Sequence, residues 1–163
     1  MNKFGSVKVW LLMSLVVCGG IGPCSQAQSQ TSQSQAKPET KSQAGAAKHA
    51  TGPFDVKMSP LPADEKANDP LMGRMTMDKR YHGELEATGT GTMLTGGDYK
   101  SGSAGYVAME KVSGTLQGRA GTFILQHSAT LNQGAQQLSI TVVPGSGTGQ
   151  LTGIAGKMDI KIQ

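Results

Sequence analysis

The stretch that decides the fold is GYVAMEKVSGTLQGRAGTFILQHSATL, residues Gly105–Leu131, in which apolar or small residues alternate with polar ones on both sides of a Gly-Arg-Ala-Gly sequence. Alternation with a period of two is the pattern of a β-strand with one buried face. Glycines permit the positive φ angles that tight turns require. The stretch therefore predicts a β-hairpin, with Gly105–Gln117 as the first strand, Gly118–Gly121 as the turn and Thr122–Leu131 as the second strand.

Two ionisable residues occupy the apolar face of this hairpin. His127 is in phase with the apolar residues of the second strand, and Glu110 with those of the first. The turn at Gly-Arg-Ala-Gly pairs Val112 with His127 and Glu110 with Ala129. Glu110 is then the diagonal neighbour of His127, with Cα atoms about 7–8 Å apart. Because an ionised carboxylate is costly to bury alone, the pattern predicts a Glu110–His127 pair on one inner face, with Tyr106 nearby.

The preceding stretch, Arg74–Leu94, repeats the alternation. Its odd-numbered positions are small or apolar apart from Lys79 and the Tyr81 hydroxyl, and nearly all its even-numbered positions are polar. The phase continues through Gly83, which predicts one long strand bent at its glycines. Lys79 and Tyr81 therefore join the inner face, whereas His82 falls on the polar face and is expected in solvent.

Shorter alternating segments complete the domain. They are Pro53–Met58, Leu138–Val143 and Leu151–Ile162, separated by polar or glycine-rich connections. The chain thus predicts an all-β fold, an antiparallel meander of six or seven strands. Many inward positions are glycine or alanine, which favours a tightly curved sheet that closes into a small barrel, because small residues relieve crowding there. A β-sandwich is the alternative.

The N-terminus has the pattern of an export signal. Residues 1–27 combine a basic start, a short apolar run and a small-residue cleavage motif that ends at Ala27. This is typical of a secretory signal, and the run is too short for a membrane-spanning helix, which takes about 20 residues. We therefore expect a periplasmic or secreted protein. Lipid attachment through Cys18 or Cys24 is less favoured, because neither cysteine follows a small residue.

The rest of the chain divides into a tether and one domain. Residues 28–50 are rich in Gln, Ser and Ala and predict a disordered tether. Residues 51–163 are a usual length for one domain, and their 10 basic and 10 acidic residues balance, so the net charge of +4 comes from the segments before them. Nucleic acid binding needs a concentrated basic face, and the domain has none.

Three longer pieces resemble a family of small bacterial proteins of unknown function. They are GRMTMDKRYHGELEATGTGTML, SAGYVAMEKVSGTLQGRAGTFILQHSATL and QLSITVVPGSGTGQLTGIAGKM. The resemblance runs from about Gly52 to Ile162 and implies a barrel similar to allene oxide cyclase and, more distantly, to the dirigent proteins, without implying their activity. Family members usually continue with one more strand. We therefore expect a barrel that closes without that strand, or an open edge between the first strand and Lys157–Ile162 where a second copy or the tether pairs.

The expected function is binding of a small, largely apolar molecule inside the barrel. The predicted ligand-binding residues are Lys79, Tyr81, Tyr106, Glu110 and His127, because a ligand pocket is mostly apolar with a few convergent polar groups. Glu110 and His127 are also the candidates for acid–base catalysis in an isomerase or cyclase. A structural or envelope-interaction protein is the third alternative. We expect no cofactor and no metal, since the pair lacks a third ligand.

Overall fold

The computed structural model describes residues 7–15, 48–62 and 69–162, which form eight β-strands and two short 3-10 helices. The strands are β1 (Val7–Leu15), β2 (Lys48–Pro60), β3 (Met72–Tyr81), β4 (Leu85–Asp98), β5 (Ser103–Leu116), β6 (Arg119–Asn132), β7 (Ala135–Val142) and β8 (Ile154–Ile162). The 3-10 helices are η1 (Tyr99–Ser101), between β4 and β5, and η2 (Gly149–Leu151), between β7 and β8.

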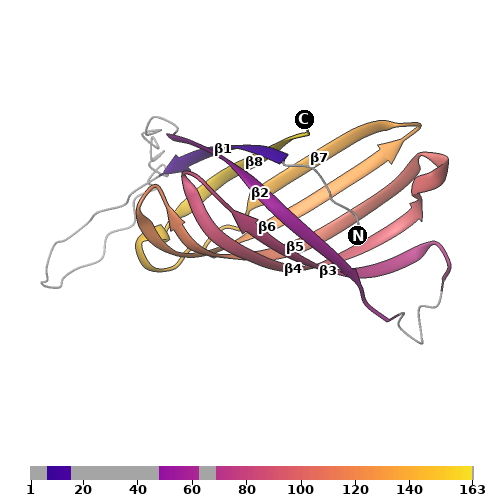
Figure 1. The fold of residues 1–163 in the computed structure, drawn as a ribbon, viewed down its shortest axis with the longest axis horizontal. Helices are drawn as coiled ribbons and strands as arrows, with labels where there is room; N and C mark the ends of the chain where they lie inside the picture. Colours follow the sequence, from indigo (N-terminus) through magenta and orange to yellow (C-terminus); the bar gives the residue numbers. More distant parts are fainter. Residues whose placement is uncertain (1–6, 16–47, 63–68, 163) are drawn as a thin grey trace, which may run out of the picture.

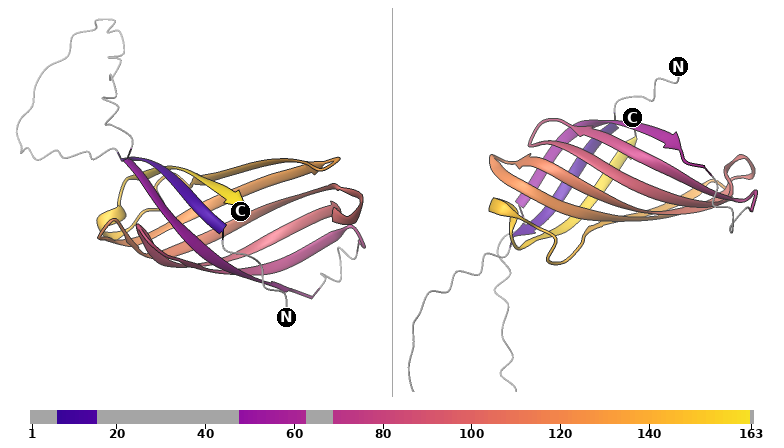
Figure 2. Two further views of the ribbon diagram at one scale, coloured as in Figure 1. Left: turned by 45° about the horizontal axis from the view of Figure 1, so that its top comes forward. Right: turned by 90° about the horizontal axis from the view of Figure 1, so that it is seen from below.

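The strands form an antiparallel meander in which each strand pairs with the next along the chain (Figure 1). Strands β2 to β8 curl into a half-barrel, and β1 lies between β8 and β2 and closes the sheet (Figure 2). The contact between β7 and β8 is narrow, with a single residue pair, Thr141 with Lys157. The prediction of an all-β meander that closes into a small barrel is confirmed, and β1 occupies the edge between β2 and β8 that we expected to be open if the barrel did not close.

Two segments that precede residue 51 belong to the sheet. Val7–Leu15, which we predicted to lie in a cleaved signal, is strand β1 here. Strand β2 begins at Lys48, inside the predicted tether, and Ala50 is 2% exposed in the barrel core. The backbone N–H of Thr51 donates to the Glu84 carboxylate at 2.7 Å, which anchors this part of β2. Lys48–Ala50, the last three residues of the predicted tether, therefore belong to β2, and residues 28–47 lie outside the described part of the chain.

The predicted long strand is a hairpin. Strands β3 and β4 pair with each other and reverse at His82–Glu84, where Gly83 has a φ of 95°. Positive φ at this position suits glycine, which explains why the chain turns here instead of bending. The register pairs Tyr81 with Ala87, so odd-numbered residues oppose odd-numbered residues. For that reason the inner face was predicted correctly although the turn was missed.

The hairpin between β5 and β6 has a shorter turn than Gly-Arg-Ala-Gly suggested. The turn is Gln117–Gly118, with φ angles of 47° and 77°, and Arg119 already pairs with Leu116. Two successive residues with positive φ form the two-residue turn that best matches the twist of the flanking strands. Glu110 consequently pairs with Leu125 instead of the expected Ala129. The shift is four residues, an even number, so every side chain keeps its predicted face.

The core has two parts along the barrel. The larger part is a continuous apolar cluster built around Phe123, Leu125 and Leu151, and the η2 segment covers its end of the barrel. Hydrogen bonds from the backbone of β6 to Gln150 and Thr148 hold that segment in place. The smaller part contains buried Met77, Met93 and Ala108, with Val56, Met58, Met75 and Tyr106 packed against it.

Candidate functional site

Four of the five predicted site residues meet inside the barrel, and we call them the charged layer: Lys79, Tyr81, Glu110 and His127. Lys79 and Tyr81 are on β3, Glu110 is on β5 and His127 is on β6. Each is at an inward position of its strand, because the alternation of each strand places it there. The diagonal relation of Glu110 and His127 survives the change of register, since His127 is two residues from the actual partner of Glu110.

Gly89 allows the layer to form across strand β4. Glu110 must reach over β4 to contact Lys79 and Tyr81, and Gly89 lies in its path. A Cβ atom at Gly89 would overlap Oε1 of Glu110 and lie 2.9 Å from its carboxyl carbon and 3.1 Å from Cε2 of Tyr81. Sequence reasoning missed this role, although the inward glycines of β4 were the signal. A glycine at an inward position marks a close approach by another group.

Glu110 is the hub of the layer. The Lys79 ammonium donates to Oε2 of Glu110 at 2.8 Å, and the Tyr81 hydroxyl donates to Oε1 at 2.6 Å. The Lys79 Nζ also lies 3.3 Å from the Tyr81 hydroxyl oxygen and 5.0 Å from the centre of the Phe54 ring. Nε2 of His127 lies 2.9 Å from Oε2 of Glu110, but without the alignment of a hydrogen bond. The imidazole and the carboxylate are therefore in close contact, but this contact lacks the directional hydrogen bond that Lys79 and Tyr81 each make.

The environment shifts two pKa values in opposite directions. Burial by itself raises the pKa of Glu110, but the contacts with His127, Lys79 and Tyr81 outweigh it and hold the pKa below its ordinary value. Burial and then the adjacent Glu110 carboxylate raise the pKa of Tyr81 well above its ordinary value. Glu110 is thus an ionised acceptor and Tyr81 a neutral donor at neutral pH.

The charged layer is enclosed. Glu110 is 0% exposed and His127 2%, and Lys79 and Tyr81 are also buried. The ammonium, the hydroxyl and the imidazole occupy the space around both carboxylate oxygens. The layer has the composition of an acid–base site. The Glu110 carboxylate accepts hydrogen bonds from Lys79 and Tyr81, whereas Nε2 of His127 has no hydrogen-bond partner among the described residues. The cluster ties strands β3, β5 and β6 together.

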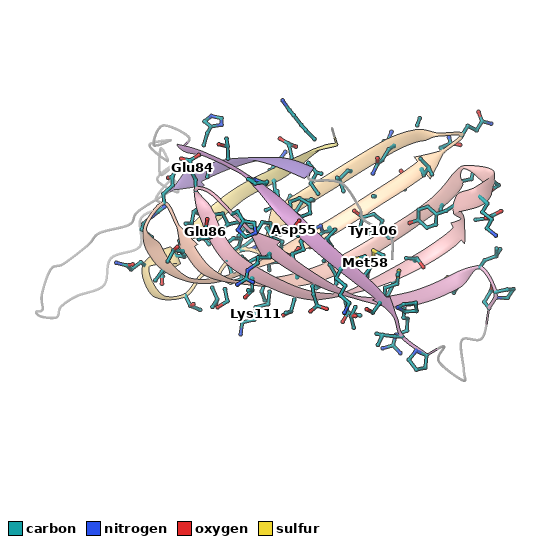
Figure 3. The ribbon with its side chains drawn as sticks, in the orientation of Figure 1. Asp55, Met58, Glu84, Glu86, Tyr106 and Lys111 are labelled. Carbon is teal, nitrogen blue, oxygen red and sulfur yellow. The ribbon has the colours of Figure 1, made fainter. Side chains whose placement is uncertain are left out.

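The fifth predicted residue, Tyr106, lies apart from the layer and lines a cavity. The cavity, which we call the mouth pocket, has a volume of about 240 Å³ and lies on the inner side of β5, β6 and β7. Its lining is Tyr99, Ala104, Gly105, Tyr106, Ala129, Thr130, Leu131 and Gln136. Tyr106 and Met58 lie in the half of the barrel away from Glu84 and Glu86 (Figure 3). Tyr99 was missed because the sequence placed it in a turn.

Other candidate chemistry is sparse in the part of the chain that the structure describes. His82 is on the outer face, 41% exposed at its side chain, with Nε2 3.5 Å from Oδ2 of Asp55. Residues 7–15, 48–62 and 69–162 contain no group of three or more His, Cys, Asp or Glu residues placed to hold a metal ion. Among these residues there is also no helix with the length and apolar character needed to cross a membrane.

Fold and site together define a class: a small all-β protein, an antiparallel meander whose strands β2 to β8 curl into a half-barrel that β1 closes, with a buried charged layer and an open pocket. Residues 50–163 match the model of the family described as "Protein of unknown function (DUF3224)". The chain belongs to this family. No curated protein matches it.

A solved structure of the same family is similar to this chain. It is the crystal structure of a protein with unknown function from the DUF3224 family of Shewanella oneidensis MR-1. The two sequences are 47% identical, the match covers 69% of this chain and 84% of the Shewanella chain, and the TM-score is 0.64. The predicted resemblance to a bacterial family of unknown function is confirmed.

Proposed function

We propose that the protein binds a small, largely apolar molecule in the mouth pocket. The main support is the pocket itself, a cavity of about 240 Å³ on the concave side of the sheet with partly exposed walls. Pockets for drug-sized ligands span about 300–1,000 Å³. The mouth pocket is smaller, which favours a ligand of at most two or three aromatic rings or a short acyl chain.

The lining suggests the chemistry of the ligand. Ala129 and Leu131 supply apolar walls, and Tyr99, Tyr106 and Gln136 supply polar groups. Burial, and then the proximity of Tyr99, raise the pKa of Tyr106, so its hydroxyl is a neutral hydrogen-bond donor at neutral pH. A ligand with an apolar body and one acceptor group, such as a carbonyl or ether oxygen, matches this arrangement.

Methionine side chains line the neighbouring interior. Met58 on β2 pairs with Met77 on β3, and Met75 on β3 pairs with Met93 on β4. These four residues form one cluster with Tyr106. Methionine is flexible and polarizable, so such a wall adapts to ligands of different shape. This supports a binding site that accepts a class of apolar molecules instead of a single one.

The burial of the charged layer favours binding over acid–base catalysis. A substrate of an isomerase would have to reach Glu110 or His127, and their exposed fractions are 0% and 2%. Contact would require the Lys79–Glu110 ion pair to separate in the interior, which is costly. The mouth pocket needs no such rearrangement to accept a ligand.

Fluorescence titration with N-phenyl-1-naphthylamine tests the proposal. We expect Ala104→Phe, which fills the pocket, to weaken binding of this probe at least tenfold. Val107→Phe is the matched control, because Val107 is on the same strand but 54% exposed on the outer face. Equal affinity of both variants for the probe would exclude the mouth pocket as its site.

We further propose that the protein is exported and that its first 27 residues are removed. The support is the basic start and short apolar run at the N-terminus. The intact mass of the protein recovered from its own host tests this. A mass equal to residues 28–163 is expected. A chain that begins at Cys18 or Cys24 and carries lipid would support the lipoprotein alternative, and an unprocessed chain would contradict both.

A further inference from the structure

The seam between β2 and β8 holds a strand from outside the family domain. Strand β1 pairs antiparallel with β2 from Val7 to Met13 and with β8 from Val7 to Leu15. The family match begins at residue 50, so β1 precedes it. Without β1, the backbone groups of β2 and β8 that face the seam have no strand partner, and such edges readily pair with an added strand.

The register shows what kind of segment the seam accepts. Leu11 is level with Ala50 on β2 and with Met158 on β8. Both of these neighbours are buried in the barrel core, with exposed fractions of 2% and 1%. Trp10 is level with Asp159, an exposed residue of the outer face. Alternate register positions along the seam therefore neighbour core residues of β2 and β8, so an extended segment with apolar residues at every second position fits it.

The connection between β1 and β2 makes this docking resemble that of a separate peptide. Residues 16–47 separate the two strands along the chain. Strand β1 is held in the seam by its pairing with β2 and β8, so a segment that pairs equally well can replace it.

We propose that the β2–β8 seam is a strand-acceptor site for an extended apolar peptide segment. In the unprocessed chain Val7–Leu15 occupies it, and after removal of residues 1–27 it is open to such a segment of a partner protein, by β-strand addition. The second half of this statement rests on the proposed export. The acceptor site itself does not, because it depends only on the two edges.

The full-length chain with Leu11→Pro provides the first test. Proline removes a backbone donor and disfavours a central strand, so β1 should leave the seam. Hydrogen exchange of the β2 and β8 amides should then speed up at least tenfold, while β5 and β6 stay protected. Gln30→Pro, in the connecting segment, is the matched control and should change neither. Unchanged exchange in β2 and β8 with Leu11→Pro would contradict the site.

Peptide binding tests the acceptor directly. The probe is a fluorescein-labelled peptide with the sequence of Val7–Leu15 and added terminal lysines. We expect at least tenfold tighter binding to the Leu11→Pro chain than to the unchanged chain, whose seam is occupied. The same peptide with proline at the position of Leu11 should not bind. Equal affinity of the peptide for both chains would overturn the proposal. A Leu11→Pro chain that forms a dimer and does not bind the peptide would also overturn it, because a second copy of the chain would then occupy the seam.

A disulfide test remains informative if Leu11→Pro fails to fold. Ser14 on β1 is level with Ala155 on β8. With Cys18 and Cys24 replaced by serine, Ser14→Cys and Ala155→Cys should form a disulfide, whereas Ser14→Cys with Ser113→Cys on β5 should not. Absence of the first disulfide would contradict the position of β1 beside β8. An unprocessed cellular protein that still forms it would contradict export alone.

Discussion

The inner surface of the barrel carries polar groups in two regions that behave differently. In the charged layer, an ammonium, a hydroxyl and an imidazole lie within hydrogen-bonding or ion-pair distance of the Glu110 carboxylate, and all four groups are buried. In the mouth pocket, Tyr99, Tyr106 and Gln136 border an open cavity. Polar groups that satisfy each other stabilise a fold, whereas polar groups that face space are available to a ligand. Variants that damage one region and spare the other test this division.

The largest effect is expected from Glu110→Leu. The change removes the hub of the charged layer and leaves the Lys79 ammonium buried without its carboxylate. Breaking a buried ion pair by removing one partner costs about 3–5 kcal/mol. Urea unfolding should show a loss of that size in the free energy of unfolding. His127→Leu should cost less, because Lys79 and Tyr81 keep their contacts with Glu110.

A Glu110→Leu variant that loses under about 1 kcal/mol would mean that the layer adds little to stability, and the contrast between the two regions would fail. Thr90→Ala serves as the control. Thr90 is exposed on the outer face of β4, and its substitution should stay within about 0.5 kcal/mol of the unchanged protein.

Gly89→Ala should have the next largest effect. The added methyl group would overlap the Glu110 carboxylate, so the carboxylate must move away from Lys79 and Tyr81. Overpacking of this kind typically costs about 1–3 kcal/mol. The free energy of unfolding measures it, and probe binding in the mouth pocket should be unchanged. If Gly89→Ala is as stable as the parent protein, Glu110 does not depend on the space above Gly89.

The sequence predicted the faces of the strands better than their turns. Alternation assigned Lys79, Glu110 and His127 to the interior correctly, because the side-chain period of a strand is two and both observed turns preserve the predicted phase. The turn at Gly83 was missed, and the turn at Gln117–Gly118 was predicted as the longer Gly118–Gly121, because several glycines can form a turn and tertiary pairing decides between them. The sequence did not predict that Val7–Leu15 forms strand β1, since this short apolar run has the pattern of an export signal.

The sequence predicted only part of the candidate site, because alternation does not give the position of a residue along the barrel. Period-two phase shows which residues face inward but not how far along the barrel each one lies. Tyr106 is only two inward steps from Glu110, yet it belongs to the mouth pocket instead of the charged layer. Ala108 lies between them on β5 and is buried in the smaller core cluster with Met77 and Met93. Which groups are sealed and which line a cavity depends on packing, and the alternation does not contain that information.

A pH dependence is the third expected effect. The pKa of Glu110 is lowered on folding, so the folded state binds fewer protons than the unfolded chain in the acid range. The stability from this source is complete above the ordinary pKa of 4.5 and is lost as the pH falls through the lowered value. Urea unfolding between about pH 6 and pH 3 should show a smaller loss for Glu110→Gln than for the parent. If the free energy of unfolding fell equally with pH in both proteins, the ionised form of Glu110 would contribute no stability to the folded state.

The smallest effect on stability is expected from Tyr106→Phe. Tyr106 is partly buried beside the mouth pocket, and its hydroxyl does not belong to the charged layer. Removing the hydroxyl should change the free energy of unfolding by less than about 0.5 kcal/mol. A ligand with an acceptor oxygen should lose about 0.5–1.5 kcal/mol of binding free energy, the usual net worth of one hydrogen bond. The apolar probe N-phenyl-1-naphthylamine should bind as before.

The two variants together separate the two regions. Glu110→Leu should change the free energy of unfolding far more than it changes ligand binding. Tyr106→Phe should change ligand binding more than it changes the free energy of unfolding. If Tyr106→Phe destabilised the barrel as much as Glu110→Leu, the mouth pocket would be part of the core and the two regions would be one.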